Sequence, residues 1–565
     1  MWCFIYGKEL KCGSVSELMS AEIVACNATF MAKLSHRFGD DKVFAENESH
    51  VVVLDGVTLN KRELIGKEQS WQDWCLKEEG YFCKKLRGLF SGVKYNKSNG
   101  SFYAFGCQIG YEPIFYYKHS DGIIVSPDFN IVWSIAKENQ LPITFDELAA
   151  NMMLSHGYLY RDNTFVSEIK KLQPGCMLVK DDKGADIEVK TYHRLKKEIV
   201  PNLTTEQAIE MVEESFTKAV RRCFDKDLEY GYSHLVDISG GLDSRTTNQV
   251  AIDLGYKNIT NLCYAKSGSV EYDCASAYSK SVGNDFFFKQ LDDLNFFYDI
   301  DLSIEQLYGL TYYFACTGGM RFMRAVNTER FGLEHSGQLG DAVLGEFHRT
   351  NGHFSFTATS TVAKIIAPQA PDLNEENEEE EIHYPYYMRM FAFTLKSQLV
   401  KRYYDWWVVS PFADIDFMHT CLSIPVEMRE GHKLYFDWLY AKHPNTTKVR
   451  CTTVDGRTQK TPMTFRHMVG KILGKRRNDF IALVKRLSGK DLELRPTNTM
   501  NPFDHWYETV PKLRDFMSDY FNGHISMLAK FPDTQKDVQK LFEQGSCLDK
   551  GCALTVLAAY KRYLS

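Results

Sequence analysis

The stretch "HLVDISGGLDSRT", residues 234–246, has the residue types of an anion-binding turn. An apolar run typical of a strand ends in Ser-Gly-Gly, and Asp243 and Ser244 follow. Two adjacent glycines let successive backbone N–H groups point into one concavity, and the start of a helix adds partial positive charge. The stretch therefore predicts a phosphate cradle. A plain glycine turn between a strand and a helix is the alternative.

This turn contains no lysine, and that limits its chemistry. A GxxxxGK[ST] loop uses its lysine to reach the β- and γ-phosphates when the terminal phosphoryl group is transferred. A cradle without lysine suits a pyrophosphate that is held as a unit and leaves after attack at the α-phosphorus. Asp243 cannot bind phosphate directly, because like charges repel, but it can hold the Mg²⁺ that does.

A second stretch, "LEHSGQLGDAVLGEF" at 333–347, also follows a short apolar run. It supplies Ser336, Gly337 and Asp341. Asp341 is the candidate for a second carboxylate at the metal. Both stretches must then lie at the same edge of a sheet, because ligands of open α/β sheets bind beyond the carboxyl ends of the strands.

The elements that would position these residues change in character along the chain. Up to about residue 195 short apolar or alternating runs are separated by turn signals, and Asp55-Gly56, Asn99-Gly100 and Asp121-Gly122 are placed where hairpin turns are expected. After Pro201, a capping box of Thr204 and Gln207 predicts a helix. Strands and short helices then alternate to about residue 290, which predicts a parallel α/β sheet.

From about residue 300 helical periodicity dominates. The acidic run Glu378–Glu381 predicts a solvated loop, and the segment 470–490 predicts a basic surface helix. The sequence thus predicts two domains, 1–198 and 199–565, the second with helical additions.

Composition excludes several classes of function. A net charge of -6 and 25% charged residues give no support to nucleic-acid binding. No window approaches the 18 or more apolar residues of a membrane helix, and the sequence shows no export signal. The 15 cysteines include no CxxC pair, which favours reduced thiols and a cytoplasmic location.

"SGGLDS" followed by "SGxxxD" resembles the nucleotide motifs of the asparagine synthetase family, the PP-loop amide-forming ligases. "VVVLDGVTLNKREL", "LRGLFSGVKYN", "GYEPIFYY" and "DNTFVSEIKKLQPG" are similar to the class II glutamine amidotransferase pattern. The resemblance implies an α+β, Ntn-type amidotransferase-like β-sandwich, then an α/β PP-loop domain with extra helices. It also implies ATP and Mg²⁺ as cofactors, and an acyl-adenylate that an amine converts to an amide.

The same resemblance implies a role for each matching residue. The residues that would hold pyrophosphate are Ser239, Gly240, Gly241, Asp243 and Ser244. Asp243 and Asp341 would hold Mg²⁺. The residues that would line the adenine and ribose are Asp237, Tyr264, Ser336 and Gly337.

The sequence departs from the family in the glutaminase half. A working glutaminase needs a cysteine with a free α-amino group, whereas this chain starts Met1-Trp2-Cys3, and tryptophan is a poor second residue for methionine removal. The family's Asn-Gly-Glu appears as Asp55-Gly56-Val57. We therefore expect no glutamine hydrolysis, and Cys3 is predicted to be a buried strand thiol.

A second departure lies in the synthetase half, where Gln338 replaces the catalytic glutamate. Glutamine cannot act as a base near neutral pH, but it can orient an amine by hydrogen bonds. The family also carries a lysine that neutralises charge at the α-phosphorus. The candidates here are Arg450, then Lys448, then Lys433, and a surface cation is the alternative for each.

The sequence therefore predicts an ATP-dependent amide-forming ligase that releases AMP and pyrophosphate. The alternatives are a true asparagine synthetase using ammonia or glutamine, and a nucleotide-binding scaffold without turnover. The carboxylate could belong to a small molecule, a sugar acid or a peptide, and the amine donor is equally open. Oligomeric state is open too, a homodimer included.

Overall fold

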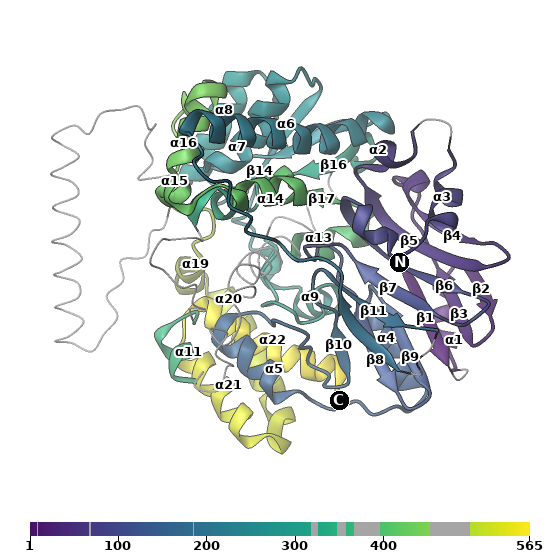
Figure 1. Cartoon of the computed structure of the whole chain (residues 1–565). Coiled ribbons are helices and arrows are strands. Elements are labelled where there is room, and N and C mark those ends of the chain that lie inside the picture. Colours follow the sequence, from purple (N-terminus) through teal and green to yellow (C-terminus); the bar gives the residue numbers. More distant parts are fainter. Residues whose placement is uncertain are drawn as a thin grey trace.

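The computed structural model describes residues 1–7, 10–66, 69–182, 184, 186–317, 326–346, 358–366, 396–452 and 498–565. The acidic run and the basic segment named above lie outside the described residues. Figure 1 shows antiparallel strands of the N-terminal half beside a parallel sheet with its helices, and the C-terminal helices below that sheet.

The N-terminal half contains two six-stranded antiparallel sheets. The first has the order β10-β8-β9-β1-β3-β2, with β1 (Trp2–Gly7), β2 (Ala21–Ala25), β3 (Ala28–Ala32), β8 (Phe115–His119), β9 (Gly122–Ser126) and β10 (Ile169–Lys171). The second has the order β12-β11-β7-β6-β5-β4, with β4 (Val43–Glu46), β5 (His50–Thr58), β6 (Gly88–Asn96), β7 (Phe102–Gly106), β11 (Cys176–Lys180) and β12 (Ile187–Thr191). Alternate residues of both sheets, such as Phe4 and Phe102, share one apolar core. The strand-rich prediction is confirmed as a sandwich.

Helices cover the outer faces of this sandwich. α3 (Trp71–Lys77) packs on β4 and β5, whereas α4 (Phe129–Glu138) packs on β8 and β9. Cys3 faces outward from β1 toward the core beneath α4 and is fully buried, and this burial raises the pKa of its thiol. The prediction of a buried strand thiol is confirmed.

Two of the three predicted hairpin turns are confirmed. Asn99-Gly100 lies between β6 and β7, and Asp121-Gly122 joins β8 to β9. Asp55-Gly56 is instead inside β5, so that prediction is wrong. Gly56 has φ +119, and a Cβ there would lie 2.0 Å from the carbonyl oxygen of Leu89. Glycine is needed here because the two strands approach closely. An Asp-Gly pair in the sequence does not distinguish this case from a hairpin turn.

The predicted parallel α/β unit is confirmed. It begins with α6 (Thr205–Glu229), whose capping box of Thr204 and Gln207 is present. The sheet order is β15-β14-β13-β16-β17, all parallel. The other elements are β13 (Ser233–Asp237), α7 (Leu242–Asp253), β14 (Ile259–Ala265), α8 (Val270–Val282), β15 (Asp285–Gln290), β16 (Phe331–His335) and β17 (Val408–Val409).

Helices dominate the rest of the described chain. They are α9 (Ile300–Leu307), α11 (Thr361–Ile366), α13 (Lys396–Lys401), α14 (Ile415–Ser423), α15 (Val426–Arg429), α16 (Lys433–Lys442), α19 (Phe503–Thr509), α20 (Pro511–His524), α21 (Pro532–Gln544) and α22 (Cys547–Tyr563). The N-terminal half adds α1 (Gly13–Ser16), α2 (Lys61–Ile65) and α5 (Glu147–His156). α22 packs against α5, so one apolar core crosses the predicted boundary at residue 198. Within the described ranges, no helix has both the length and the apolarity to cross a membrane.

Candidate functional site

A cavity of about 330 Å³ lies beyond the carboxyl ends of β13, β14 and β16. β13 pairs with β14 on one side and with β16 on the other, so the strand order reverses at β13. Ligands of open α/β sheets bind at such a point. Nine predicted site residues line the cavity: Asp237, Ser239, Asp243, Ser244, Tyr264, Ser336, Gly337, Gln338 and Asp341.

The turn from Ser239 to Ser244, the predicted anion cradle, is closed by its own hydrogen bonds. The backbone N–H of Ser239 donates to the Ser244 hydroxyl at 3.0 Å, and that of Gly241 donates to the Ser239 hydroxyl at 3.1 Å. α7 begins at Leu242, and no side chain caps its N-terminus. The positive end of a twelve-residue helix therefore points toward the cavity wall.

The two predicted metal ligands, Asp243 and Asp341, are neighbours at this turn and both line the cavity. The backbone N–H of Asp341 donates to Asp243 Oδ2 at 3.0 Å, and the Tyr435 hydroxyl donates to Asp243 Oδ1 at 2.9 Å. Tyr435 belongs to α16 and was missed from the sequence, because no motif marks it. Mg²⁺ in nucleotide sites is typically held by one or two carboxylates and the substrate phosphates, so Asp243 and Asp341 fit such an ion.

The loop carrying Asp341 is packed tightly on the cradle. A Cβ on Gly337 would lie 2.1 Å from the Ser244 backbone nitrogen, and one on Gly340 would lie 2.6 Å from Asp243 Cγ. Leu339, between them, has φ +79, a left-handed conformation that leucine rarely adopts. Close approach and local strain thus define this loop.

The predicted cations do not line the cavity. Lys448, Arg450 and Lys433 have exposed side chains. The segment that carries Lys448 and Arg450 is nevertheless fixed to the cradle. The Arg245 guanidinium donates to the Arg450 carbonyl at 2.7 Å, and the backbone N–H of Thr452 donates to the Gly240 carbonyl at 2.7 Å.

Two other lysines, Lys396 and Lys401 of α13, line the cavity instead. Lys401 forms a buried ion pair with Glu334 of β16, and although burial alone would lower the pKa of Lys401, this pairing raises it. Burial, then the neighbouring Glu334, raises the pKa of Asp237 well above its ordinary value. One wall of the cavity therefore holds Asp237, whose neutral form is favoured by burial, and the Lys401 side chain.

Asp227, His234 and His335 form a second cluster with metal-ligating atoms. All three are buried, and each histidine already hydrogen-bonds the same oxygen, Asp227 Oδ2, at 2.7 Å. Asp227 Oδ1 also accepts from the backbone N–H of Leu333 at 2.7 Å. Both oxygens of the Asp227 carboxylate are therefore hydrogen-bonded within the protein. These bonds hold β16 against α6 directly before the Ser336–Asp341 loop.

No protein-family model and no curated protein matches the chain. Among solved structures the chain is similar to an allosteric regulatory enzyme of purine biosynthesis, at 10% identity and TM-score 0.22, over 51% of this chain and 58% of that one. It is also similar to a glutamine phosphoribosylpyrophosphate amidotransferase from B. subtilis in complex with ADP and GMP, at 9% identity and TM-score 0.23, over 52% of this chain and 85% of that one. Likenesses of this size identify neither an activity nor a site.

Proposed function

We propose that the protein is an ATP-dependent amide-forming ligase of the asparagine synthetase type, with a PP-loop at Ser239–Ser244. The observation that carries the proposal is the meeting of Asp243 and Asp341 beside a lysine-free cradle at the mouth of a parallel sheet. A kinase-like site would need a cation in the cradle for the terminal phosphate. A cradle without one favours release of the two outer phosphates as a unit.

The proposed reaction has two steps. A carboxylate oxygen of the substrate attacks the α-phosphorus of ATP, and the bond to pyrophosphate breaks with its electron pair. An amine nitrogen then attacks the acyl carbon, AMP leaves with the bonding electrons, and the nitrogen loses a proton. Activation is required because a carboxylate oxygen is a very poor leaving group, whereas AMP is a good one.

Different residues would carry out the parts of this reaction. N–H groups at the uncapped start of α7, with the Ser239 and Ser244 hydroxyls, would bind pyrophosphate. Asp243 and Asp341 would hold Mg²⁺, which when bound would offset phosphate charge. Gln338 would orient the amine, since its amide can donate and accept hydrogen bonds but cannot take a proton at neutral pH.

Carboxylate-dependent exchange of labelled pyrophosphate into ATP tests the proposal. The purified protein is incubated with Mg²⁺, ATP and a panel of small amino acids, sugar acids and carboxyl-bearing peptides. We expect exchange with at least one acid, and loss of it in Asp341→Asn. The matched control is Asp121→Asn, which changes an exposed carboxylate in the β8–β9 turn.

Two other outcomes would replace the proposal. Magnesium-dependent ATP binding without exchange for any acid would favour a nucleotide-binding scaffold, for which Gln338 is the supporting observation. Asparagine formation from aspartate and ammonia would favour a true asparagine synthetase. Glutamine as the nitrogen source is disfavoured, because Cys3 is fully buried and burial raises the pKa of its thiol.

A further inference from the structure

We infer that Tyr111, a residue of the N-terminal half, positions the Gln338–Asp341 loop of the ligase site by acting through Ser410. The Tyr111 hydroxyl accepts a hydrogen bond from the Ser410 backbone N–H at 2.9 Å. The Ser410 hydroxyl in turn donates to the Gln338 carbonyl at 2.6 Å. Two hydrogen bonds therefore connect the sandwich to the loop that carries a proposed metal ligand.

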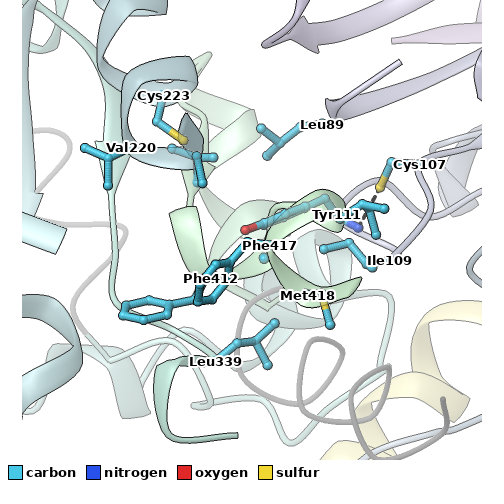
Figure 2. Close-up of a cluster of buried hydrophobic side chains, with 14 of the residues drawn as sticks. Leu89, Cys107, Ile109, Tyr111, Val220, Cys223, Leu339, Phe412, Phe417 and Met418 are labelled. Atoms are coloured by element: carbon cyan, nitrogen blue, oxygen red, sulfur yellow. Dashed lines mark hydrogen bonds between the residues drawn. The ribbon is translucent and has the colours of Figure 1, made fainter. Parts of the chain in front are cut away.

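The loop needs such support because its conformation is strained. Leu339, next to Gln338, has φ +79, a conformation that a non-glycine residue keeps only when its surroundings hold it there. Leu339 is buried, and it belongs to the same apolar cluster as Phe412, Phe417 and Tyr111 (Figure 2). Apolar packing holds the side chain, and Ser410 holds the neighbouring carbonyl.

Tyr111 is itself held firmly. Its ring is buried in the cluster of Figure 2, and its backbone N–H donates to the Cys107 thiol sulfur at 3.0 Å. The next residue, Glu112, lies 3.5 Å from the Arg402 guanidinium. The 107–112 segment is thus anchored in the sandwich and contacts the second half of the chain at two consecutive residues.

Ser410 lies between strand β17 and the loop at 336–341. It directly follows β17, which pairs with β16, and the backbone N–H of Ser336 donates to the Val409 carbonyl at 2.7 Å. The 409–410 segment therefore supports the loop at both Ser336 and Gln338. In this arrangement a sandwich whose Cys3 is buried still contributes to catalysis, by fixing the loop rather than by supplying ammonia.

The inference rests on the proposed ligase for its kinetic test, so the experiment also has a readout independent of turnover. Tyr111→Phe removes the hydroxyl and keeps the ring. Tyr103→Phe is the matched control, because its buried hydroxyl donates to the Gly80 carbonyl at 2.9 Å, within the sandwich. Both variants are compared by pyrophosphate exchange and by amide hydrogen exchange across 336–341.

We expect Tyr111→Phe to lower kcat roughly 5- to 10-fold with less than a 2-fold change in KM for ATP, since a loop displaced by a fraction of an ångström affects chemistry more than binding. Loop amides should exchange faster by a similar factor, and Tyr103→Phe should change neither quantity. Ser410→Ala, which removes only the bond to Gln338, should behave as Tyr111→Phe does and carries the test if Tyr111→Phe does not fold.

The outcomes separate the two proposals. If the wild-type protein shows no exchange with any acid, the ligase proposal fails, and the hydrogen-exchange comparison alone decides the positioning role. If Tyr111→Phe and Ser410→Ala match Tyr103→Phe in both kcat and amide exchange, the positioning role of Tyr111 is refuted, whatever the reaction.

Discussion

The tight contact between the two loops of the site makes Gly337 the most informative position for substitution. In Gly337→Ala the new Cβ would lie 2.1 Å from the Ser244 backbone nitrogen and 2.3 Å from the Asp243 carbonyl carbon. Both are backbone atoms at the start of α7, so no side-chain rotation can relieve the overlap. The loop and the helix must separate.

The size of the movement follows from these distances. A Cβ essentially never lies closer than 3.0 Å to such an atom, and ordinary contact begins near 3.4 Å, so the two loops must move apart by about 0.9 to 1.3 Å. Overpacking of this kind costs roughly 1–3 kcal/mol of stability. The hydrogen bond from the Asp341 N–H to Asp243, 3.0 Å long, cannot survive a displacement of that size.

We expect Gly337→Ala to weaken magnesium-dependent ATP binding, and to lower pyrophosphate exchange about 100-fold, since misplacement by 1 Å can cost that much. Calorimetry of ATP with and without Mg²⁺ measures the first effect. Gly39→Ala is the control, because a Cβ there meets nothing within 4 Å and the residue has no positive φ. A fully active Gly337→Ala with unchanged ATP affinity would refute the convergence of the two carboxylates.

Three further predictions concern buried groups. Burial raises the pKa of Glu112 from 4.5 to about 7 despite the nearby Arg402, so the folded state keeps a proton that the unfolded chain loses. Up to about 3 kcal/mol of folding stability is therefore lost as the pH rises between these two values. Thermal unfolding measured against pH should show this loss in the wild type and not in Glu112→Gln. Leu339→Ala should lower the free energy of unfolding by about 2–5 kcal/mol. Leu339→Gly should be more stable than Leu339→Ala by about 1 kcal/mol, because at φ +79 glycine is less strained than alanine. Chemical denaturation checks this ranking, and the opposite order would show that the loop is unstrained. Lys401→Met should cost about 3–5 kcal/mol by leaving Glu334 buried without its partner, and adding Glu334→Gln should recover most of the loss; failure of the double variant to recover would show that packing, not charge, stabilises the wall.

Local sequence signals predicted the α/β unit well, because each element carries its own boundary chemistry. The capping box at Thr204 and the glycines after α7 and α8 mark the helix ends in both sequence and structure. Strand β14, Ile259–Ala265, coincides with an apolar run between two helices. Asp55-Gly56 misled, because a positive φ inside a strand and one in a turn favour the same residue.

Some residues of the site could be identified from the sequence and others could not. Those in short motifs, such as Asp243 and Asp341, could be selected because their spacing reflects a strand end followed by a helix. Tyr435, Glu334 and Lys401 could not, because they come from separate elements and no local pattern marks them. Lys401 lines the cavity, whereas Tyr435 contacts Asp243 and Glu334 contacts Lys401. Gln338 could be identified as a departure, but its support by Ser410 could not, because the two residues are 72 positions apart in the chain.

The source of positive charge at the α-phosphorus is the point on which sequence and structure differ most. An adenylating site must stabilise the charge that develops as this phosphorus becomes five-coordinate. Arg450, the candidate from the sequence, has an exposed side chain and does not line the cavity, whereas Lys396 and Lys401 do. Lys401 also forms the buried ion pair with Glu334, so its replacement would combine a loss of stability with any loss of activity, whereas Lys396 can be tested separately. We therefore expect Lys396→Met to lower pyrophosphate exchange about 100- to 1000-fold and Arg450→Met to change it less than about 3-fold. The reverse ranking would show that the 448–452 segment moves toward the phosphates when ATP binds, and would restore Arg450 as the catalytic cation.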